Sequence, residues 1–451
     1  MRHLLSTRLV TLLATATVAA CAGGGEGADP SGVEQTDTPR DAGRPETGPS
    51  PTYDAGVLDA GQTVDSGSPN APDAGSSMDS GPGLEAGGDD ASAVDSGPPA
   101  ALAIAAGDLH SCAIRVDATV ACWGSNSSGQ LGNGTTTDSP VPVPVTGLAG
   151  VQQLAAGWAH TCALVQGGTV MCWGHGANGD LGNGATNPSA TPVAVQGIAT
   201  ATAIGANGYH ACALLAGGAV QCWGYGQDGE LGNGASVDSS IPVSVTGLTD
   251  ATALGVGSAQ DCAVRLDHTA ECWGSNTYGD LGDGQMGAGS SVPVAVTGLS
   301  DVASLGAGLL HVCALDTMGN VSCWGYGADG EIGNGQMADQ ASPVAATGMA
   351  GVASIAAGDY HTCAVMTSGR VTCWGQGTYG QIGNGTNFST AWPAPVLDLL
   401  DGAQVSGGMS HTCALTTAGH VVCWGSDSNG QLGNGTTSAS AVTTPVPVTG
   451  L

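Results

Sequence analysis

The sequence predicts an all-β fold: a seven-bladed β-propeller closed by its N- and C-terminal strands and preceded by a disordered linker. Three observations lead to this prediction. From residue 101 onward the chain repeats a unit of about 50 residues seven times. Each unit holds only short runs rich in Val, Ile, Leu and Ala, interrupted by Gly and Pro, and no helical periodicity. Each unit also carries two cysteines at fixed places. Several short strands per unit of this length are typical of propeller blades.

The N-terminal residues predict export and a lipid anchor. Two arginines precede an apolar stretch over 9–20, which has the length of a signal peptide and is too short to cross a bilayer. The stretch ends in Val-Ala-Ala-Cys, which resembles a bacterial lipobox, so we expect a signal peptide over 1–20 and lipidation of Cys21. An ordinary cleaved signal with an incidental cysteine is the alternative. Because Ala22 is not Asp, we expect the outer membrane or the cell surface of a bacterial envelope rather than the inner membrane.

A linker is expected over 21–98. This segment consists mainly of Gly, Ala, Asp, Ser and Pro, and it has almost no large apolar residue to bury. Such a composition cannot offset the entropy of ordering, which predicts disorder. The recurring Asp-Ala-Gly and Asp-Ser-Gly triplets suggest weak calcium binding as an alternative to an inert spacer.

The charge of the chain limits its partners. There are 37 acidic and 7 basic residues, which gives a formal net charge of −30. Nucleic-acid binding depends on cations that pair with phosphates, so no nucleic-acid partner is expected. Anionic membranes also repel such a chain, and contact with a membrane is expected only through the lipid anchor.

The propeller is expected over 99–451. One unit reads Ala-Ala-Gly-x-x-His-Thr-Cys-Ala-Leu, then Val-x-Cys-Trp-Gly, then Gly-Gln-Leu-Gly-Asn-Gly, then Pro-Val-x-Val-x-Gly-Leu. The last Pro-Val-x-Val segment, near 445–451, is expected to join the sheet that begins at Ala101 and so to close the ring.

The unit resembles the regulator of chromosome condensation repeat, and the resemblance covers 101–451. It implies seven blades of four strands, in agreement with the repeat period. Relatives of this repeat include guanine-nucleotide exchange factors for small GTPases, chromatin-binding proteins and a secreted bacterial inhibitor of β-lactamase. The paired cysteines depart from the general pattern of the eukaryotic members.

The cysteines predict one disulfide in each blade. Within a unit the two cysteines flank a tight turn between two strands, which sets them directly opposite each other at a Cβ separation of about 4.5–5.5 Å. Zinc is the rival interpretation, but zinc sites usually use closer Cys-x-x-Cys spacing. An exported protein also meets an oxidising compartment. The expected pairs are Cys112–Cys122, Cys162–Cys172, Cys212–Cys222, Cys262–Cys272, Cys313–Cys323, Cys363–Cys373 and Cys413–Cys423.

Two further repeated positions are candidates for metal binding. The first position holds a histidine in six units. These histidines could form a metal-binding ring, but each lies in a different blade and the propeller spreads them apart. A structural hydrogen bond within each blade is therefore preferred. The histidines are His110, His160, His210, His311, His361 and His411, with Gln260 in the fourth unit. In the second, the Gly-rich segment, a carboxylate recurs too irregularly for calcium ligation, and a turn with positive φ is preferred. Its variable position holds Gln130, Asp180, Glu230, Asp280, Glu331, Gln381 and Gln431. We therefore expect no metal, no cofactor and no catalytic residue.

The aromatic residues that vary between units predict a binding surface. They fall in two loop types, one just before the His position and one just after Cys-Trp-Gly. In an antiparallel hairpin the start of one strand and the end of the next lie at the same end, so both loop types open on one face. Packing between blades is the alternative role. The candidates are Trp158, Tyr209, Tyr225, Tyr278, Tyr326, Tyr360 and Tyr379.

The expected function is therefore binding of a protein or peptide at the cell envelope by a lipid-anchored monomer. Nucleotide-exchange activity, implied by the family resemblance, and inhibition of a secreted enzyme are the alternatives. The sequence does not identify the partner.

Overall fold

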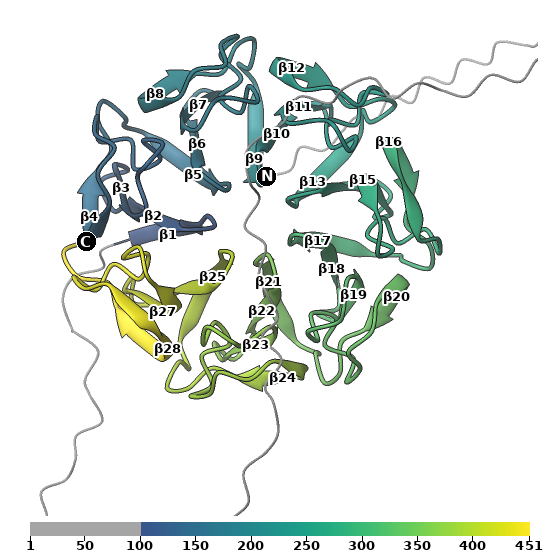
Figure 1. Cartoon of the computed structure of the whole chain (residues 1–451). Coiled ribbons are helices and arrows are strands. Elements are labelled where there is room, and N and C mark those ends of the chain that lie inside the picture. The colour runs from purple at the N-terminus through teal and green to yellow at the C-terminus, as the bar shows by residue number, and fades with distance from the viewer. Residues whose placement is uncertain (1–100) are drawn as a thin grey trace, which may run out of the picture. The chain divides into compact units, whose positions relative to one another are not determined.

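The computed structural model describes residues 101–451, which form seven separate sheets of four antiparallel strands. The predicted signal peptide, Cys21 and the linker up to residue 98 lie outside the described residues. Figure 1 shows the sheets arranged as blades around a central axis, with the first strand of each blade nearest the centre. The predicted all-β, seven-bladed propeller is confirmed. Within residues 101–451 no helix has the length and apolar character that a membrane span requires.

The first two strands of each blade are short and largely buried. The innermost strands are β1 (Ala101–Ala106), β5 (Val151–Ala156), β9 (Ala201–Asn207), β13 (Ala251–Val256), β17 (Val302–Ala307), β21 (Val352–Ala357) and β25 (Gly402–Gly407). The second strands are β2 (His110–Arg115), β6 (His160–Val165), β10 (His210–Leu215), β14 (Gln260–Arg265), β18 (His311–Asp316), β22 (His361–Met366) and β26 (His411–Thr416). Nearly every residue of the second strands is buried, because both faces of each strand lie against neighbouring blades.

In the outer half of each blade the third strand is mostly buried, whereas the outermost strand is partly exposed. The third strands are β3 (Val120–Gly124), β7 (Thr169–Gly174), β11 (Val220–Gly224), β15 (Ala270–Asn276), β19 (Val321–Gly325), β23 (Val371–Gly375) and β27 (Val421–Asp427). The outermost strands are β4 (Ser139–Pro144), β8 (Ser189–Ala194), β12 (Ser239–Ser244), β16 (Gly287–Ala295), β20 (Gln340–Ala345), β24 (Thr390–Pro395) and β28 (Ser438–Pro447). The outermost strands carry the prolines, which lack the N–H that a central strand needs and are tolerated at a sheet edge.

The seven predicted disulfides are confirmed. In each blade the two cysteines stand directly opposite each other in the second and third strands, as Cys413 does opposite Cys423. Their Cα atoms are 4.0–4.1 Å apart, and each of these fourteen cysteines is buried. Each bridge therefore joins the two strands that form the centre of a blade, which have few large side chains of their own.

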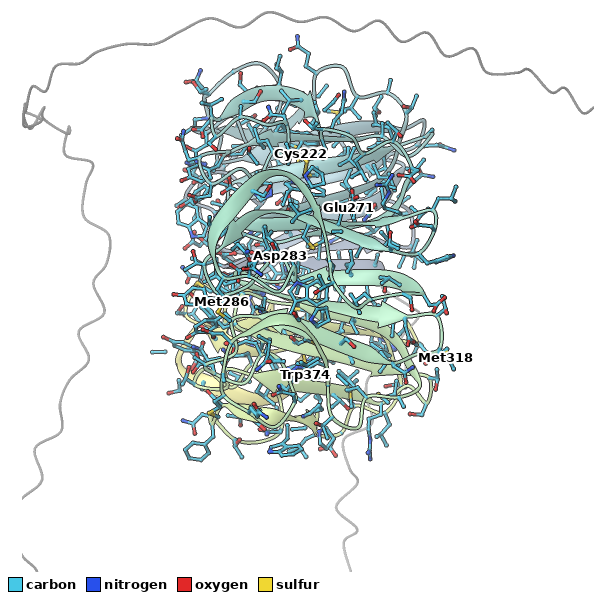
Figure 2. All side chains as sticks on the ribbon, turned by 90° about the vertical axis from the view of Figure 1, so that its right-hand side faces the viewer. Cys222, Glu271, Asp283, Met286, Met318 and Trp374 are labelled. Atoms are coloured by element: carbon cyan, nitrogen blue, oxygen red, sulfur yellow. A yellow bond between two sulfur atoms is a disulfide. The ribbon has the colours of Figure 1, made fainter. Side chains whose placement is uncertain are left out.

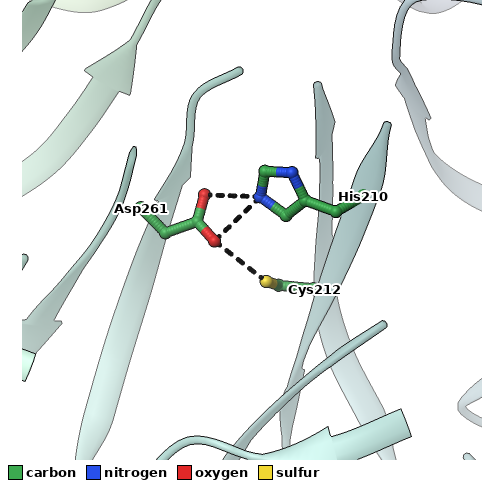
Figure 3. Close-up of side chains that lie close together, drawn as sticks. All are labelled: His210, Cys212 and Asp261. Atoms are coloured by element: carbon green, nitrogen blue, oxygen red, sulfur yellow. Dashed lines mark hydrogen bonds and ion pairs between the residues drawn. The ribbon is translucent and has the colours of Figure 1, made fainter. Parts of the chain in front are cut away.

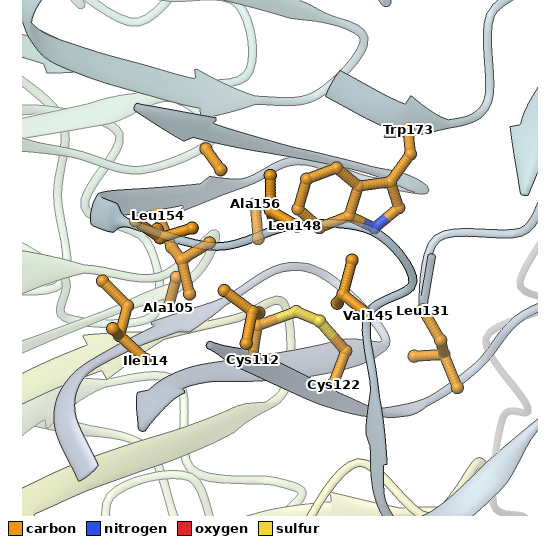
Figure 4. Close-up of a cluster of buried hydrophobic side chains, with 13 residues drawn as sticks. Ala105, Cys112, Ile114, Cys122, Leu131, Val145, Leu148, Leu154, Ala156 and Trp173 are labelled. Atoms are coloured by element: carbon orange, nitrogen blue, oxygen red, sulfur yellow. A yellow bond between two sulfur atoms is a disulfide. The ribbon is translucent and has the colours of Figure 1, made fainter. Parts of the chain in front are cut away.

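The hydrophobic core lies between blades rather than within them. One cluster contains Cys112, Ile114 and Leu131 of the first blade together with Leu154 and Trp173 of the second (Figure 4). Six further clusters of the same kind occur in the described residues, and one of them joins the last blade to the first. Each blade is therefore stabilised mainly by its neighbours.

A buried tryptophan crosses each blade boundary. The indole Nε1 of Trp173 donates a hydrogen bond of 2.8 Å to the backbone carbonyl of Gln130 in the preceding blade. Its six counterparts make the same bond at 2.7–2.9 Å. Gly132 lies against this ring with φ +66°, and a Cβ added there would stand 2.7 Å from Nε1. The Leu-Gly element of the repeat is thus required by the tryptophan of the next blade.

The repeated histidines also act across boundaries, so the predicted hydrogen bond within each blade is wrong. His110 Nε2 lies 2.8 Å from the Thr161 hydroxyl of the next blade. Thr161 donates its proton to the Gln130 carbonyl at 2.9 Å, so His110 donates through Nε2. Burial lowers the pKa of His110 to about 3, and the ring is neutral. The partner lies about one repeat away in sequence, because both faces of the second strand contact other blades.

The ring closes by the same contacts that join its other blades. The predicted transfer of the C-terminal strand to the first sheet is wrong, because β28 pairs with β27 in the last blade. The first and last blades instead meet through Trp123, whose Nε1 donates to the Gln431 carbonyl at 2.9 Å, and through Ser111, whose hydroxyl contacts His411 at 2.8 Å. The unit that begins at residue 101 contains one whole blade, so no strand is left over to exchange.

The histidine bond can be tested with a pair of substitutions. Thr161→Ala removes the acceptor of His110 and should lower the free energy of unfolding by about 1–3 kcal/mol, since a buried donor is left unpaired. Ala211 occupies the equivalent position opposite His160, whose ring nitrogens have no partner among the described residues. Ala211→Ser should therefore raise the free energy of unfolding by about 1 kcal/mol.

The measurement is denaturant unfolding with the disulfides intact. Ser111 already forms this hydrogen bond with His411, which is the precedent for serine at position 211. Equal stability of both variants and the parent chain would remove any role for this bond in joining blades.

Candidate functional site

The two loop types predicted to share a face do share one. The turns between the first and second strands, such as 107–109, and the loops between the third and fourth strands, such as 125–138, lie at the same end of every blade. The turns between the second and third strands lie at the other end. Figure 2 views the ring from its edge, with Met286 of a third-to-fourth loop and Met318 of a second-to-third turn toward opposite sides. We call the end that carries the first two loop types the aromatic face.

The second and third blades bring three rings together on this face. The Trp158 and Tyr209 ring centroids are 4.9 Å apart. His175 lies 6.1 Å from Trp158 and 5.4 Å from Tyr209, with both pairs near edge-to-face. Trp158 keeps 36% of its surface exposed, although its neighbours hold it in place. A partly exposed ring on a supported base is suited to anchoring a binding partner.

The other predicted aromatics occupy the same face but form no single cluster. Tyr278 of the fourth blade and Tyr326 of the fifth pack edge to face at 5.0 Å. Tyr225 and Tyr360 are half-buried, and Tyr379 is 46% exposed. Burial, followed by nearby carboxylates, raises the pKa of Tyr326 to about 12, so its hydroxyl stays protonated at neutral pH.

The sequence interpretation missed three residues. His175, which completes the first cluster, stands at the position that Tyr225 and Tyr326 occupy in other blades. Phe388, the single phenylalanine of the chain, is 73% exposed near the start of β24, and Trp392 is exposed on that strand against Gly335 of the fifth blade. Both break the repeat as visibly as the tyrosines do, and a comparison of all aromatic positions between units would have found them.

Charge is distributed unevenly between the two ends. The three arginines of the described residues, Arg115, Arg265 and Arg370, all lie at the end opposite the aromatic face, at the junction of second and third strands. Arg265 is paired there with Asp250 and Glu271, each at 2.8 Å. Carboxylates occur at both ends, but the loops of the aromatic face carry them without any arginine: Asp138, Asp228, Asp238, Asp283, Asp329 and Asp339. The aromatic face therefore presents negative charge without arginine.

The carboxylates of the Gly-rich segments hold their own loops. Glu331 Oε2 accepts the backbone N–H of Asp329 at 3.0 Å, and Gln130 makes the equivalent bond to Ser128 at 2.9 Å. The predicted turn with positive φ is confirmed, as at Gly129, where φ is +86°. Burial raises the pKa of Glu331 to about 8, which makes it an acid that titrates near neutral pH.

A cluster resembling a metal site occurs once in the described residues (Figure 3). His210 Nε2 lies 2.9 Å from one oxygen of Asp261, and Cys212 Sγ lies 3.4 Å from the same oxygen. The disulfide between Cys212 and Cys222 leaves no thiolate for a metal. Burial opposes a charge on His210, but Asp261, with Glu230 and Asp180, outweighs this effect and raises the pKa of the ring. The cluster is an ion pair between the third and fourth blades.

Comparison with known proteins agrees with this architecture. Two models of the regulator of chromosome condensation (RCC1) repeat match the chain. One matches residues 102–130, 151–180, 201–230, 352–381 and 403–431, and the other matches 117–164, 217–264, 272–315, 318–365 and 368–415.

Solved structures share the fold at low identity. Human WBSCR16 is 22% identical with a TM-score of 0.64, over 70% of this chain and 87% of its own. Yeast RCC1 (Prp20), solved bound to Kap60, is 21% identical with a TM-score of 0.65, over 73% and 83%. Prp20p from Saccharomyces cerevisiae, in a structure whose description includes its binding to Gsp1p and histones, is 20% identical with a TM-score of 0.63, over 78% and 88%.

The buried acid of the fifth blade predicts a pH dependence that one substitution removes. Because burial raises the pKa of Glu331 from 4.5 to about 8, the folded protein holds a proton that the unfolded chain loses. This stabilisation is present below pH 4.5 and is lost as the pH rises through about 8. Glu331→Gln removes the titration. The variant should match the parent chain near pH 4.5 and exceed its free energy of unfolding by on the order of 3 kcal/mol at pH 9.

Gln stands at the equivalent position in three other blades, so the loop accepts it. Gln381→Glu is the matched control and should show the opposite slope with pH. The measurement is unfolding by denaturant at a series of pH values, and parallel curves for Glu331→Gln and the parent chain would contradict the assignment.

Proposed function

The chain belongs to the regulator of chromosome condensation (RCC1) repeat family, and from that premise we propose that its propeller binds a basic protein or peptide through the aromatic face. The proposed contact residues are Trp158, Tyr209, Tyr225, Tyr278, Tyr326, Tyr360 and Tyr379, with His175 as the support of the first cluster.

One observation carries this proposal. The partly exposed Trp158–Tyr209 pair stands on a face whose loops carry carboxylates, while all three arginines of the described residues lie at the opposite end. Aromatic anchors supply binding energy through burial, and like charges around them repel acidic partners. A basic partner is attracted to this face and is steered toward the aromatic residues.

The related structures support a binding role in general terms. One describes yeast RCC1 bound to the protein Kap60, and another describes the binding of Prp20p to Gsp1p and histones. At 20–21% identity these likenesses establish the fold and not a partner. Exchange activity and inhibition of a secreted enzyme both require a protein docked on the propeller, so either outcome would appear as an identified partner in the capture experiment below. We propose no catalytic residue and no cofactor.

The N-terminal sequence supports a location for this binding. The apolar segment and the Val-Ala-Ala-Cys sequence favour export and lipidation at Cys21. We therefore propose that the propeller acts as a monomer at the bacterial envelope, held by its lipid and set away from the membrane by the linker.

The aromatic face can be tested by truncating its exposed pair. Trp158→Ala/Tyr209→Ala should weaken capture of the partner from envelope and secreted proteins by more than about tenfold, because interface aromatics commonly contribute about 2 kcal/mol or more. The melting temperature should stay close to that of the parent chain, since partly exposed side chains contribute little to the core. The measurement is quantitative capture on the immobilised full chain, with mass-spectrometric identification.

Leu266→Ala/Met318→Ala is the matched control, because both side chains are exposed at the opposite end. It should leave capture unchanged. The association rate of the captured partner should also fall as ionic strength rises from about 0.05 to about 0.5 M. Equal loss from both double variants, or a strongly acidic partner, would contradict the proposal.

The anchor has its own test. Cys21→Ala should move the protein from the membrane fraction to the soluble fraction and abolish metabolic labelling with palmitate, because the sulfur that carries the lipid is gone. Fractionation and labelling of cells that express each form measure this. Labelling that persists in the variant would place the lipid elsewhere.

A further inference from the structure

The central channel opens between the innermost strands as a cavity of about 210 Å³. Its lining is mostly Ala and Gly, which leaves room that larger side chains would fill. Five polar side chains line the cavity: Asp108, Asn207, Asp359, Gln404 and Ser406. Gln404 and Ser406 bond to the backbone of the first blade, to Ile104 and Ala106, and help to close the ring. Asp108 and Asp359 serve no such boundary.

These two aspartates occupy equivalent turns on the aromatic face. Each follows the glycine at the end of an innermost strand, in the first and sixth blades, with only the seventh blade between them. Each is only 6% exposed. No described residue donates a hydrogen bond to the Asp108 carboxylate, and Asp359 receives one from the Ser258 hydroxyl, at 3.3 Å. Burial and repulsion by Asp359 raise the pKa of Asp108, as expected for a buried acid without a cation.

The surrounding network has few side-chain donors, namely the Ser258 hydroxyl and the Asn207 amide group. The Ser258 hydroxyl lies 2.9 Å from Asn207 Oδ1 and 3.3 Å from Asp359 Oδ1, but its single proton serves only one of them at a time. Asn207 Oδ1 accepts one further bond, from the backbone N–H of Gly208 at 2.8 Å. The mouth of the channel therefore gathers carboxylate and amide oxygens, and the N–H groups of Asn207 Nδ2 bond to no other described residue.

Aromatic residues stand beside this acidic pair. Tyr360 directly follows Asp359, and Tyr209 stands two residues after Asn207. Trp158 occupies in the second blade the turn position that Asp108 occupies in the first. Burial and then Asp108 raise the pKa of Tyr209, while burial, Asp359 and Asp108 raise that of Tyr360, so both hydroxyls lie within the field of the acids. The acids and these tyrosines therefore share one region of the aromatic face.

We propose that the mouth of the central channel is a binding pocket for one arginine side chain of the partner, held between Asp108 and Asp359 with Asn207 as a further acceptor. The planar guanidinium has five N–H donors and no acceptor, which matches the deficit of this site. Its single charge would offset one of the two negative charges of the ionised pair, and neither carboxylate has a cationic partner among the described residues. This inference rests on the proposed docking of a basic partner on the aromatic face, and it names the chemical group that the face recognises.

The probe is N-acetyl-argininamide, titrated by calorimetry into the purified full chain. The neutral isostere N-acetyl-citrullinamide should bind at least about tenfold more weakly, because it has the same shape without the charge. Asp108→Asn and Asp359→Asn should each weaken the arginine probe by about tenfold or more. Asp267→Asn, an exposed acid at the opposite end, is the matched control and should leave binding unchanged.

The comparison of the two probes on the unmodified chain tests the pocket even if an Asn variant fails to fold. Equal binding of the arginine and citrulline probes would overturn the pocket, and so would calcium that binds and displaces the arginine probe, since the acceptors would then form a metal site. Arginine binding that persists in both Asn variants would overturn it as well.

The arginine pocket and the docking of a partner on the aromatic face are separable. Capture of a partner that depends on Trp158 and Tyr209 but not on Asp108 or Asp359 would remove the pocket and leave the proposed function standing. Arginine binding without any captured partner would do the reverse.

Discussion

The ring depends on one hydrogen bond repeated at every blade boundary: the indole N–H of a Cys-Trp-Gly tryptophan to a backbone carbonyl of the preceding blade. The bond requires a glycine against the indole ring, a loop that turns its carbonyl inward, and a third strand that ends at the boundary. These requirements account for much of the repeated sequence. The disulfides hold the two central strands of each blade in register, so that the tryptophan that follows the second cysteine arrives at a defined place.

A second bond at the boundaries is present in some blades and absent in others. Four boundaries carry a histidine bonded to a hydroxyl of the next blade. At the three consecutive boundaries from the second to the fifth blade, the hydroxyl residue is replaced by Ala211, Asp261 and Val312. The tryptophan bond persists at all three. At the boundary of Asp261 the histidine bonds to the carboxylate instead of a hydroxyl. The propeller therefore tolerates the loss of this side-chain-to-side-chain bond at the boundaries of Ala211 and Val312, where the tryptophan bond remains.

The sequence predicts those features that arise within one unit. The blade number follows from the period, and the disulfide register follows from a tight turn midway between Cys413 and Cys423. The shared face of Trp158 and Tyr225 follows from strand direction alone, and the same reasoning would have assigned Arg115, Arg265 and Arg370 to the opposite end.

Contacts between units were beyond such reasoning. The partner of His110 is Thr161, about one full repeat away, and the choice between a closed last blade and an exchanged strand depends on where a blade begins within the repeat. Asp108 and Asp359 look like ordinary turn residues in sequence, since their neighbourhood exists only after the ring has closed. The sequence therefore could not predict the chemistry of the channel, because residues from blades that are distant along the chain form it.

Two of the boundaries that lack the histidine–hydroxyl bond lie next to aromatic contacts on the aromatic face. Trp158 and Tyr209 meet across the boundary of Ala211, and Tyr278 and Tyr326 meet across that of Val312. Between them, His210 and Asp261 form the buried ion pair. The aromatic contacts stabilise their boundaries locally. Trp158 nevertheless keeps a third of its surface exposed to solvent, which a side chain with a purely structural role would not need. The boundaries of Ala211 and Val312, which lack the histidine bond, thus lie next to the Trp158–Tyr209 and Tyr278–Tyr326 contacts. The proposed binding would use the solvent side of rings whose other side packs between blades.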